Sequence, residues 1–175
     1  MDLTRRAAPD PYDSLPERPW FQVTSDDLTD GARLDDRFAE QHDNESPHLR
    51  WSGAPAGTQG FAVTCFDPDA PTSSGWWHWL LVDLPAETTE LPHGAGGGAV
   101  ALPGGAFHVR NDAGNQQYDG PAPPPGDGDH RYVFVVHALD VPSLQVQPDT
   151  PAAQVGIGIT FHTLARGRIT GTWSR

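Results

Sequence analysis

The chain contains no lysine, so its positive charge depends on arginine and on protonated histidine. It carries 11 basic and 23 acidic residues, which gives a formal net charge of −12 at pH 7. Nucleic acids and anionic membrane surfaces bind to basic patches, which this composition does not supply. The sequence therefore predicts no nucleic-acid partner, and any anion site has to be built from local groups.

Cysteine is almost absent as well. The one cysteine, Cys65, lies in an apolar run, which is typical of a buried thiol, and a single cysteine excludes an intrachain disulfide. The chain also lacks any run of 18 apolar residues, and its first 20 residues lack the apolar stretch of a signal peptide. These absences predict a cytoplasmic protein without membrane insertion.

The length of 175 residues fits one domain with one core. Nineteen glycines and 18 prolines indicate a loop-rich globular chain and argue against a helical bundle. Residues 1–19, rich in proline, aspartate and arginine, predict an extended arm that becomes ordered by packing on the body. Residues 20–175 then form the single domain.

Apolar and β-branched runs predict strands along most of this domain, and proline ends several of them. The predicted strands span residues 20–23, 61–66, 76–84, 131–141 and 169–173. Between the third and fourth of these, residues 85–129 are rich in glycine and proline and show no periodic pattern, which is typical of a functional or disordered loop.

One helix is predicted near the C-terminus. Thr150 followed by Pro151 resembles a helix start, with threonine as N-cap and proline at the first helical position. Helical spacing then places Ala152, Val155, Ile159 and His162 on one face. Strands that dominate the chain, with one late helix, predict a mainly β fold: an antiparallel β-sandwich with a peripheral C-terminal helix.

Strand parity points to one cluster of polar residues. Asp67 follows the strand of residues 61–66, His78 shares a strand face with Trp76, and His130 shares one with Tyr132. The same parity places Leu80 and Val82 on the face of His78, and Trp77 and Trp79 on the other. If the three strand ends meet, Asp67 orients an imidazole and raises its pKa, which creates a donor for a bound anion.

Other interpretations of these residues remain open. The sequence DPDAP at 67–71 is compatible with an ordinary Asp/Pro turn, and His78 with a hydrogen-bonded core histidine. Zinc on Asp67, His78 and His130 lacks the support of an HExxH or paired Cys/His motif, so no metal or cofactor is predicted. No GxSxG motif indicates a serine esterase.

Several motifs together resemble the phosphatidylethanolamine-binding protein family, in its bacterial and archaeal Raf-kinase-inhibitor-like branch. They are SPHLRWSG at 46–53, DPDAP at 67–71, WWHW at 76–79, LPGGA at 102–106, NDAG at 111–114, YDGPAPPPG at 118–126, DHRY at 129–132 and GTWSR at 171–175. The resemblance implies a Greek-key β-sandwich with a small pocket for phosphate, acetate or a phosphorylated head group. Its floor would be Asp67, His78 and His130, with Asp69 behind, Trp76 on the wall, and Pro123, Pro124 and Tyr132 along the rim.

Three functions are compatible with such a pocket. The first is a non-enzymatic protein that binds a small anion, a phosphorylated ligand or a phosphorylated partner protein. The second is an enzyme, a hydrolase or isomerase, that uses Asp67, His78 and His130 for acid–base chemistry. The third, implied by the resemblance alone, is regulation of a kinase through protein contact. The resemblance is also consistent with a homodimer.

Overall fold

A computed structural model describes residues 5–175 of the chain. The described elements, in chain order, are β1 (Trp20–Thr24), the 3-10 helix η1 (Asp36–Phe38), β2 (Leu49–Ser52), β3 (Gly60–Asp67), β4 (Trp76–Pro85), β5 (Glu90–Leu91), β6 (Phe107–His108), β7 (His130–Leu139), α1 (Ala152–His162) and β8 (Thr163–Trp173). The mainly β class with one C-terminal helix is confirmed.

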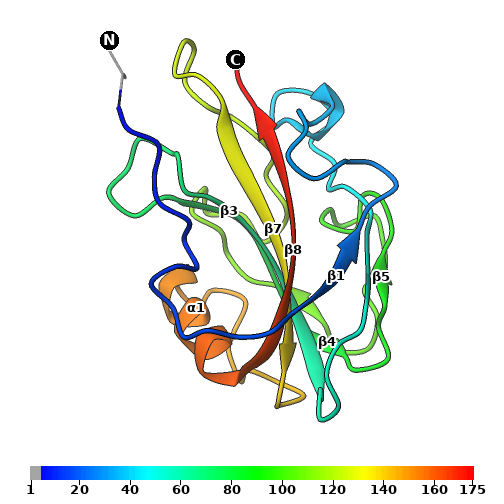
Figure 1. Ribbon diagram of the computed structural model, residues 1–175. Coiled ribbons are helices and arrows are strands. Elements are labelled where there is room, and N and C mark those ends of the chain that lie inside the picture. The colour runs from blue at the N-terminus through cyan, green and yellow to red at the C-terminus, as the bar shows by residue number, and fades with distance from the viewer. Residues whose placement is uncertain (1–4) are drawn as a thin grey trace.

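The strands form one curled sheet of eight, in the order β5-β2-β1-β8-β7-β3-β4-β6 (Figure 1). Most neighbours are antiparallel, but β1 and β8 pair in parallel, with Trp20 beside Arg166. The two layers expected of an antiparallel β-sandwich are thus the two halves of one curled sheet, which contains one parallel pair. Because β1 joins the two halves, the β1-β2-β5 end folds over and faces the long strands β3, β4, β7 and β8.

The main core, called here the inner core, fills the space inside this curl. Trp51 of β2 meets Phe61 of β3 with ring centroids 5.4 Å apart, a contact between the two facing layers. Leu49 and Leu91 are also buried there. Burial of these large apolar side chains is the principal stabilising contribution of this side of the sheet.

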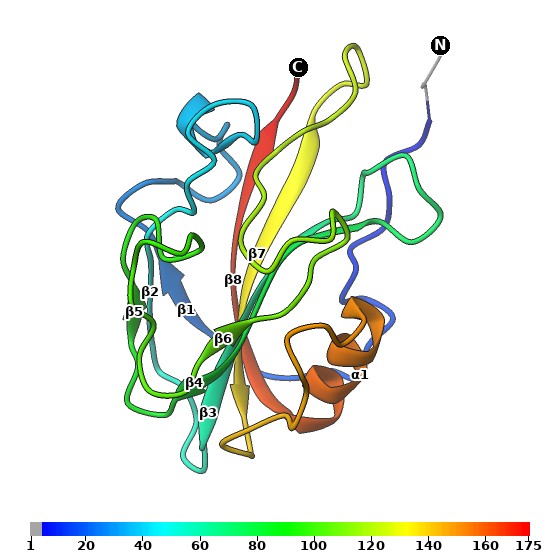
Figure 2. The ribbon, with the colours of Figure 1, turned by 180° about the vertical axis from the view of Figure 1, so that it is seen from behind.

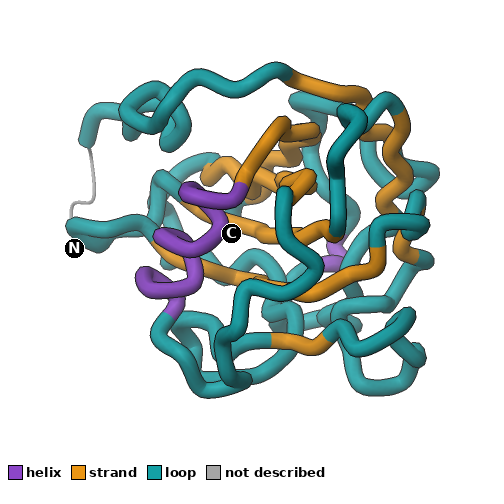
Figure 3. The backbone as a smooth tube through the Cα atoms, turned by 90° about the horizontal axis from the view of Figure 1, so that it is seen from below, coloured by secondary structure: helices purple, strands orange, loops and turns teal. Residues whose placement is uncertain are grey.

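A second apolar cluster lies on the outer face of the sheet. Val155 and Ile159 of α1 pack there against Leu80 and Val82 of β4. The view from behind shows α1 on one side of the long strands and β1, β2 and β5 on the other (Figure 2). Seen from below, α1 again lies outside the curved sheet (Figure 3).

The strands predicted over 61–66, 76–84 and 131–141 correspond to β3, β4 and β7 within two residues at each end. The closing strand is much longer than its predicted span of 169–173, because β8 begins at Thr163, directly after α1. Within 85–129 the structure contains two short strands, and Ala95, Val109 and Tyr118 are buried there.

The parity prediction for β4 is only partly correct because the strand is irregular. Its register against β3 shifts between Cys65–Trp79 and Phe66–Trp77, so His78 is an extra residue. A β-bulge of this kind interrupts the alternation of faces. Trp79 therefore joins the inner core on the side of His78, whereas Leu80 and Val82 belong to the outer cluster together with Trp77.

The predicted helix is present, and Ala152, Val155 and Ile159 form its buried face. Its predicted cap is wrong: Pro151 is the N-cap residue, and the Thr150 hydroxyl accepts a hydrogen bond from the Gln147 amide instead. His162 is not on the buried face, since it is half-exposed and forms an ion pair with Asp140 at 2.8 Å.

Residues 5–19 run along the outer face of the sheet beside α1 before they enter β1 (Figure 1). Residues 1–4 of the predicted arm lie outside the described residues, and the boundary at residue 19 remains a prediction. Among residues 5–175, no helix is long and apolar enough to span a membrane.

Candidate functional site

The predicted polar residues meet because β3 lies between β7 and β4 and is antiparallel to both. The C-terminal end of β3 is therefore adjacent to the first residues of β4 and β7. Asp67 pairs directly with Trp76 in this register, and His130 is the first residue of β7. The topology brings the three strand ends to one edge of the sheet, which is the condition that the sequence analysis set for a cluster.

A cavity of about 340 Å³ opens at this edge. Seven of the eight predicted site residues line it: Asp67, Trp76, His78, Pro123, Pro124, His130 and Tyr132. The lining also includes Glu40, Thr72, Asn115, Asp119 and Gly120, which the sequence did not single out.

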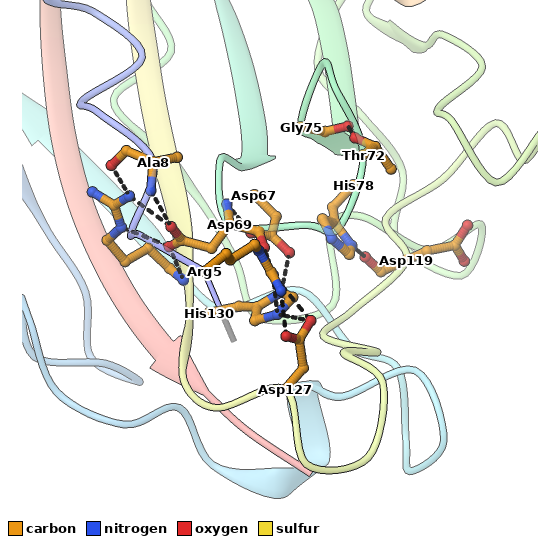
Figure 4. A network of polar contacts seen from close by, with 11 residues as sticks. Arg5, Ala8, Asp67, Asp69, Thr72, Gly75, His78, Asp119, Asp127 and His130 are labelled. Atoms are coloured by element: carbon orange, nitrogen blue, oxygen red, sulfur yellow. Dashed lines mark hydrogen bonds and ion pairs between the residues drawn. The ribbon is translucent and has the colours of Figure 1, made fainter. Parts of the chain in front are cut away.

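His130 lies between two carboxylates (Figure 4). Its Nδ1 is 2.7 Å from Asp67 Oδ2 and its Nε2 is 3.0 Å from Asp127 Oδ2. Burial alone would lower the pKa of His130, but the hydrogen bonds and charges of Asp67 and Asp127 outweigh it and raise the pKa. Carboxylates only accept hydrogen bonds, so this arrangement favours the imidazolium form, which donates from both ring nitrogens.

His78 has the opposite character. It is buried, and this burial lowers its pKa, although a hydrogen bond to the Asp119 carbonyl and nearby carboxylates oppose the effect. The 2.7 Å contact between Nδ1 and that carbonyl requires Nδ1 to carry the proton, because a carbonyl oxygen cannot donate. Nε2 of the neutral ring is then a hydrogen-bond acceptor on the cavity wall.

Tyr132 completes the wall between the two histidines. Its ring contacts the His78 ring edge-to-face, with centroids 5.1 Å apart. Its hydroxyl is buried and has no hydrogen-bond partner among the described residues, although the main chain of Ala122 lies close to it. Buried polar groups without partners are rare in proteins.

Asp69 lies behind the cavity and does not line it. Its carboxylate accepts two hydrogen bonds from the Arg131 guanidinium, at 2.7 Å and 2.8 Å, one from the Arg131 amide and one from the Ala8 amide. Its own amide donates to Asp67 Oδ1 at 2.7 Å, an Asx-type turn that orients the Asp67 carboxylate. Asp69 therefore acts on the cavity through Asp67.

Asp127 is an important residue that the sequence reasoning missed. It ends a turn in which the Asp127 amide donates to the Pro124 carbonyl, with Pro125 and Gly126 as the central residues. Gly126 has φ +79°, so the turn has the type II pattern, which requires glycine at this position. The recognisable signal was Asp127 three residues before His130, directly after a Pro-Gly turn.

Arg5 and Asp119 were also missed. Arg5, from the N-terminal segment, forms an ion pair with Asp127. This contact, and to a smaller extent the contact with His130, holds the pKa of the Asp127 carboxyl below its usual range. The Asp119 carboxylate accepts hydrogen bonds from the side-chain amides of Asn44, Asn111, Asn115 and Gln117. This aspartate lies four residues before Pro123, within the segment that has no periodic pattern.

No cluster of three metal-ligating side chains suited to a metal ion occurs in the part of the chain that the structure describes. His130 already has a carboxylate at each ring nitrogen, and His78 donates through Nδ1. The site thus consists of one imidazolium, one neutral imidazole and one unpaired phenol around a small cavity.

A curled β-sheet that holds an Asp/His/His pocket at one edge defines a recognisable class of protein. The model of the phosphatidylethanolamine-binding protein family matches residues 24–174, and this chain belongs to that family. The YbhB protein of Escherichia coli K12 is 49% identical over 159 residues, which cover 88% of this chain and 100% of YbhB.

Solved structures agree with this assignment. The crystal structure of Escherichia coli YbcL has a TM-score of 0.86 and 42% identity, and covers 89% of this chain and 98% of YbcL. The CT736 protein of Chlamydia trachomatis has a TM-score of 0.76 and 28% identity, with the same coverage of 89% and 98%.

Proposed function

We propose that this protein is a non-enzymatic binding protein whose pocket takes up a small anionic ligand, with a phosphomonoester preferred over a carboxylate. The observation that carries the proposal is the buried hydroxyl of Tyr132, a residue that lines the cavity: no group among residues 5–175 accepts the hydroxyl proton. A ligand oxygen would satisfy this donor, and unsatisfied buried donors cost about 1–3 kcal/mol.

The charge around His130 supports an anion at this position. Its imidazolium lies at the cavity wall, but Asp67 and Asp127 already occupy both ring nitrogens. Asp127 does not line the cavity, whereas His130 does. An incoming anion would therefore compete with the Asp127 carboxylate for the Nε2 proton, so Asp127 would limit affinity.

His78 supports the preference for phosphate. Its Nε2 accepts a hydrogen bond, so it favours a ligand that carries a proton as well as a negative charge. A singly protonated phosphate or phosphomonoester has both, whereas a carboxylate has only the charge. A phosphorylated side chain of a partner protein offers the same chemistry as a small phosphomonoester.

Two further observations support binding over catalysis. The Thr72 hydroxyl, which lines the cavity, donates to the Gly75 carbonyl at 2.6 Å. Cys65 is fully buried, and this burial raises the pKa of its thiol well above the usual value. Neither side chain resembles an activated nucleophile.

The first test is an NMR titration at pH 6 with phosphate, phosphoethanolamine, phosphoserine and acetate. We expect saturable shifts of the His78 and His130 side-chain signals, with the phosphorylated compounds binding more tightly than acetate. His130→Ala should weaken phosphate binding about tenfold or more, because a charge-assisted interaction is lost. Asp127→Asn should tighten it.

His162→Ala is the matched control, because His162 is a half-exposed histidine that forms an ion pair away from the cavity. This variant should bind phosphate like the parent protein. Equal affinity in the parent and in His130→Ala, or no shift with any anion, would refute the assignment. Turnover of a phosphoester that disappears in Asp67→Asn would contradict the non-enzymatic proposal.

The affinity should also depend on pH in one direction. His130 has a raised pKa, so its charge persists above the ordinary histidine pKa of about 6.5 and is lost as the pH rises through the raised value. Sulfate, which does not titrate in this range, should therefore bind most tightly at low pH and more weakly above neutrality. Calorimetry from pH 5.5 to pH 9 measures this, and a pH-independent affinity would contradict it.

A further inference from the structure

A second cavity, of about 510 Å³, lies on the outer face of the sheet between α1 and the N-terminal segment. In Figures 1 and 2 this segment descends beside α1 before it crosses to β1. The apolar part of the lining includes Pro11, Leu15, Phe66, Trp77, Ile157 and Phe161. The volume is within the usual range for small-molecule sites.

The wall of this cavity contains two polar residues on neighbouring strands. His137 of β7 and Arg166 of β8 are direct cross-strand partners, and both line the cavity. Both are buried, with exposed fractions of 3% and 2%. Nδ1 of His137 and Nε of Arg166 have no hydrogen-bond partner among residues 5–175.

The charge of Arg166 is not neutralised within the described residues. None of their carboxylates forms an ion pair with its guanidinium, and its one side-chain hydrogen bond runs from Nη1 to the Pro16 carbonyl at 3.2 Å. Buried arginines are almost always paired with an acid, because desolvating an unpaired charge is costly. Burial lowers the pKa of His137 to about 3, so this neighbour is neutral and adds no charge.

Tyr12 covers this polar pair from the N-terminal segment. Its ring lies 5.1 Å from the Arg166 guanidinium carbon, and its centroid is 6.1 Å from that of His137. The aromatic face offsets part of the arginine's charge, but it supplies no hydrogen-bond acceptor to the unpaired N–H groups. Tyr12, His137 and Arg166 all line the same cavity, so a ligand inside it can reach Arg166 beside this ring.

The mouth of the cavity is formed by exposed apolar side chains. Phe161 and Ile157 of α1 are 74% and 58% exposed, and they are two of the three large hydrophobic residues exposed in the described part of the chain. Trp77 of β4 also lines the cavity. Apolar walls around a buried, unneutralised arginine are complementary to a molecule with an apolar tail and an anionic head.

We propose that this cavity binds an anionic amphiphile, a medium-chain fatty carboxylate. Its carboxylate would pair with Arg166 and accept a hydrogen bond from His137, and its alkyl chain would lie along Trp77, Ile157 and Phe161. The cavity depends on Pro11, Tyr12 and Leu15, which precede residues 24–174, the part matched by the family model. The cavity shares no lining residue with the histidine pocket, so the site is separate from it and independent of the function proposed for it.

The unpaired arginine decides between this occupant and a protein partner. The exposed Phe161 and Ile157 alone would also suit a second copy of the chain or another protein. A protein surface placed on this mouth would cover the apolar side chains but would leave Arg166 without an anion in the cavity. An amphiphile accounts for both features.

The test uses calorimetry on the full chain with decanoate, below its micelle concentration, and with decanol as the uncharged probe of equal chain length. We expect decanoate to bind saturably. Decanol should bind with an affinity at least about tenfold lower, because it cannot form an ion pair with the buried arginine. Arg166→Gln should reduce decanoate binding to the level of decanol. Excess inorganic phosphate should not displace decanoate.

A pair of glycine variants tests the location without removing a buried charge. Gly156 lines the cavity, and a Cβ there would lie 3.7 Å from Trp77, so Gly156→Leu fills the cavity. Gly158 does not line it, and its Cβ would lie 3.8 Å from Leu144, so Gly158→Leu is the matched control in the same helix. We expect decanoate binding to be lost in Gly156→Leu and kept in Gly158→Leu.

Four results would overturn the proposal: no decanoate binding, equal binding of decanol, unchanged binding in Gly156→Leu, or displacement by phosphate. Sedimentation velocity adds a check on the other occupants. A dimer that dissociates in Phe161→Ser, together with an absence of decanoate binding, would assign this face to a second copy of the chain.

Discussion

His137 is a buried histidine that makes the free energy of unfolding depend on pH. Arg166 and Tyr12 are the charged and titratable groups that face it, and Thr64 contacts its Nε2 at 3.2 Å. Burial, followed by the charge of Arg166, lowers its pKa to about 3. The unfolded chain binds this proton near pH 6.5, whereas the folded protein does not, so stability is lost as the pH falls below 6.5.

Replacing this histidine should therefore make the protein less sensitive to acid. Between pH 7 and pH 5, His137→Gln should lose about 2 kcal/mol less unfolding free energy than the parent, since one fewer proton binds on unfolding. Urea unfolding at both pH values measures the difference, and His162→Gln, at a half-exposed site, is the control. Parallel losses in the parent and in His137→Gln would show that His137 takes up a proton in the folded state.

The polar groups of the pocket were predictable in part. Asp67, His78 and His130 follow from strand ends and parity, because each lies at the boundary of a strongly β-forming run. Asp127 and Asp119 were not predictable in this way, since turns and side-chain amides hold them, and these have no periodic pattern. The roles of the histidines also depend on the fold: Asp67, and after it Asp127, raise the pKa of His130, whereas burial lowers the pKa of His78.

At the level of elements, β4 shows where sequence periodicity loses information. Its start and end were predictable from the aromatic run and from Pro85, but its bulge was not. The bulge places His78 and Trp79 on the same side of the sheet, the side of the inner core. The pairing of β4 with β3 determines where in β4 the bulge occurs. The two-residue strands β5 and β6 were missed for a related reason, because a pairing of two residues leaves no alternation to detect.

The loop that completes the pocket depends on a glycine at position 120. A Cβ there would lie 1.8 Å from the Phe38 carbonyl oxygen, and the Gly120 amide donates to the Asn44 side chain at 2.7 Å. Because the atoms that this Cβ would meet belong to the main chain of Phe38 and Ala39, rotation of a side chain cannot relieve the clash. This close approach explains why the segment between Tyr118 and Pro123 is ordered without belonging to a helix or strand.

Gly120→Ala should therefore destabilise the protein by about 1–3 kcal/mol, the usual cost of overpacking. It should also weaken phosphate binding, since the neighbouring Asp119 carbonyl fixes the His78 ring. Gly105→Ala is the matched control, because a Cβ at Gly105 meets no atom within 4 Å and its φ is not in the left-handed region. Urea unfolding of both variants measures this, and equal midpoints would contradict the argument.

On the scale of the whole molecule, the N-terminal segment connects the two cavities. Arg5 pairs with Asp127 beside the histidine pocket, and Tyr12 covers Arg166 in the apolar cavity. Between them, the Ala8 carbonyl accepts a hydrogen bond from Arg131 and the Ala8 amide donates to Asp69. The sequence predicted an arm that packs on the body, but not that it would reach both cavities, because its contacts are made by residues about 60 to 160 positions away.

Asp69 is the residue through which the arm is held at its centre, so its removal should loosen the arm without opening the sheet. In Asp69→Ala, the Ala8 amide loses its acceptor and Arg131 loses three hydrogen bonds, two from its guanidinium and one from its amide. Hydrogen exchange of the Ala8 amide should accelerate about tenfold or more, while amides of β3 and β7 keep their protection, because local opening requires less free energy than global unfolding. Asp149→Ala, at an exposed aspartate 3.9 Å from Arg110, should leave Ala8 unchanged. If Ala8 exchanges at the parent rate in Asp69→Ala, the arm is held by Tyr12 and Arg5 instead, and both cavities should then keep their ligand affinities in that variant.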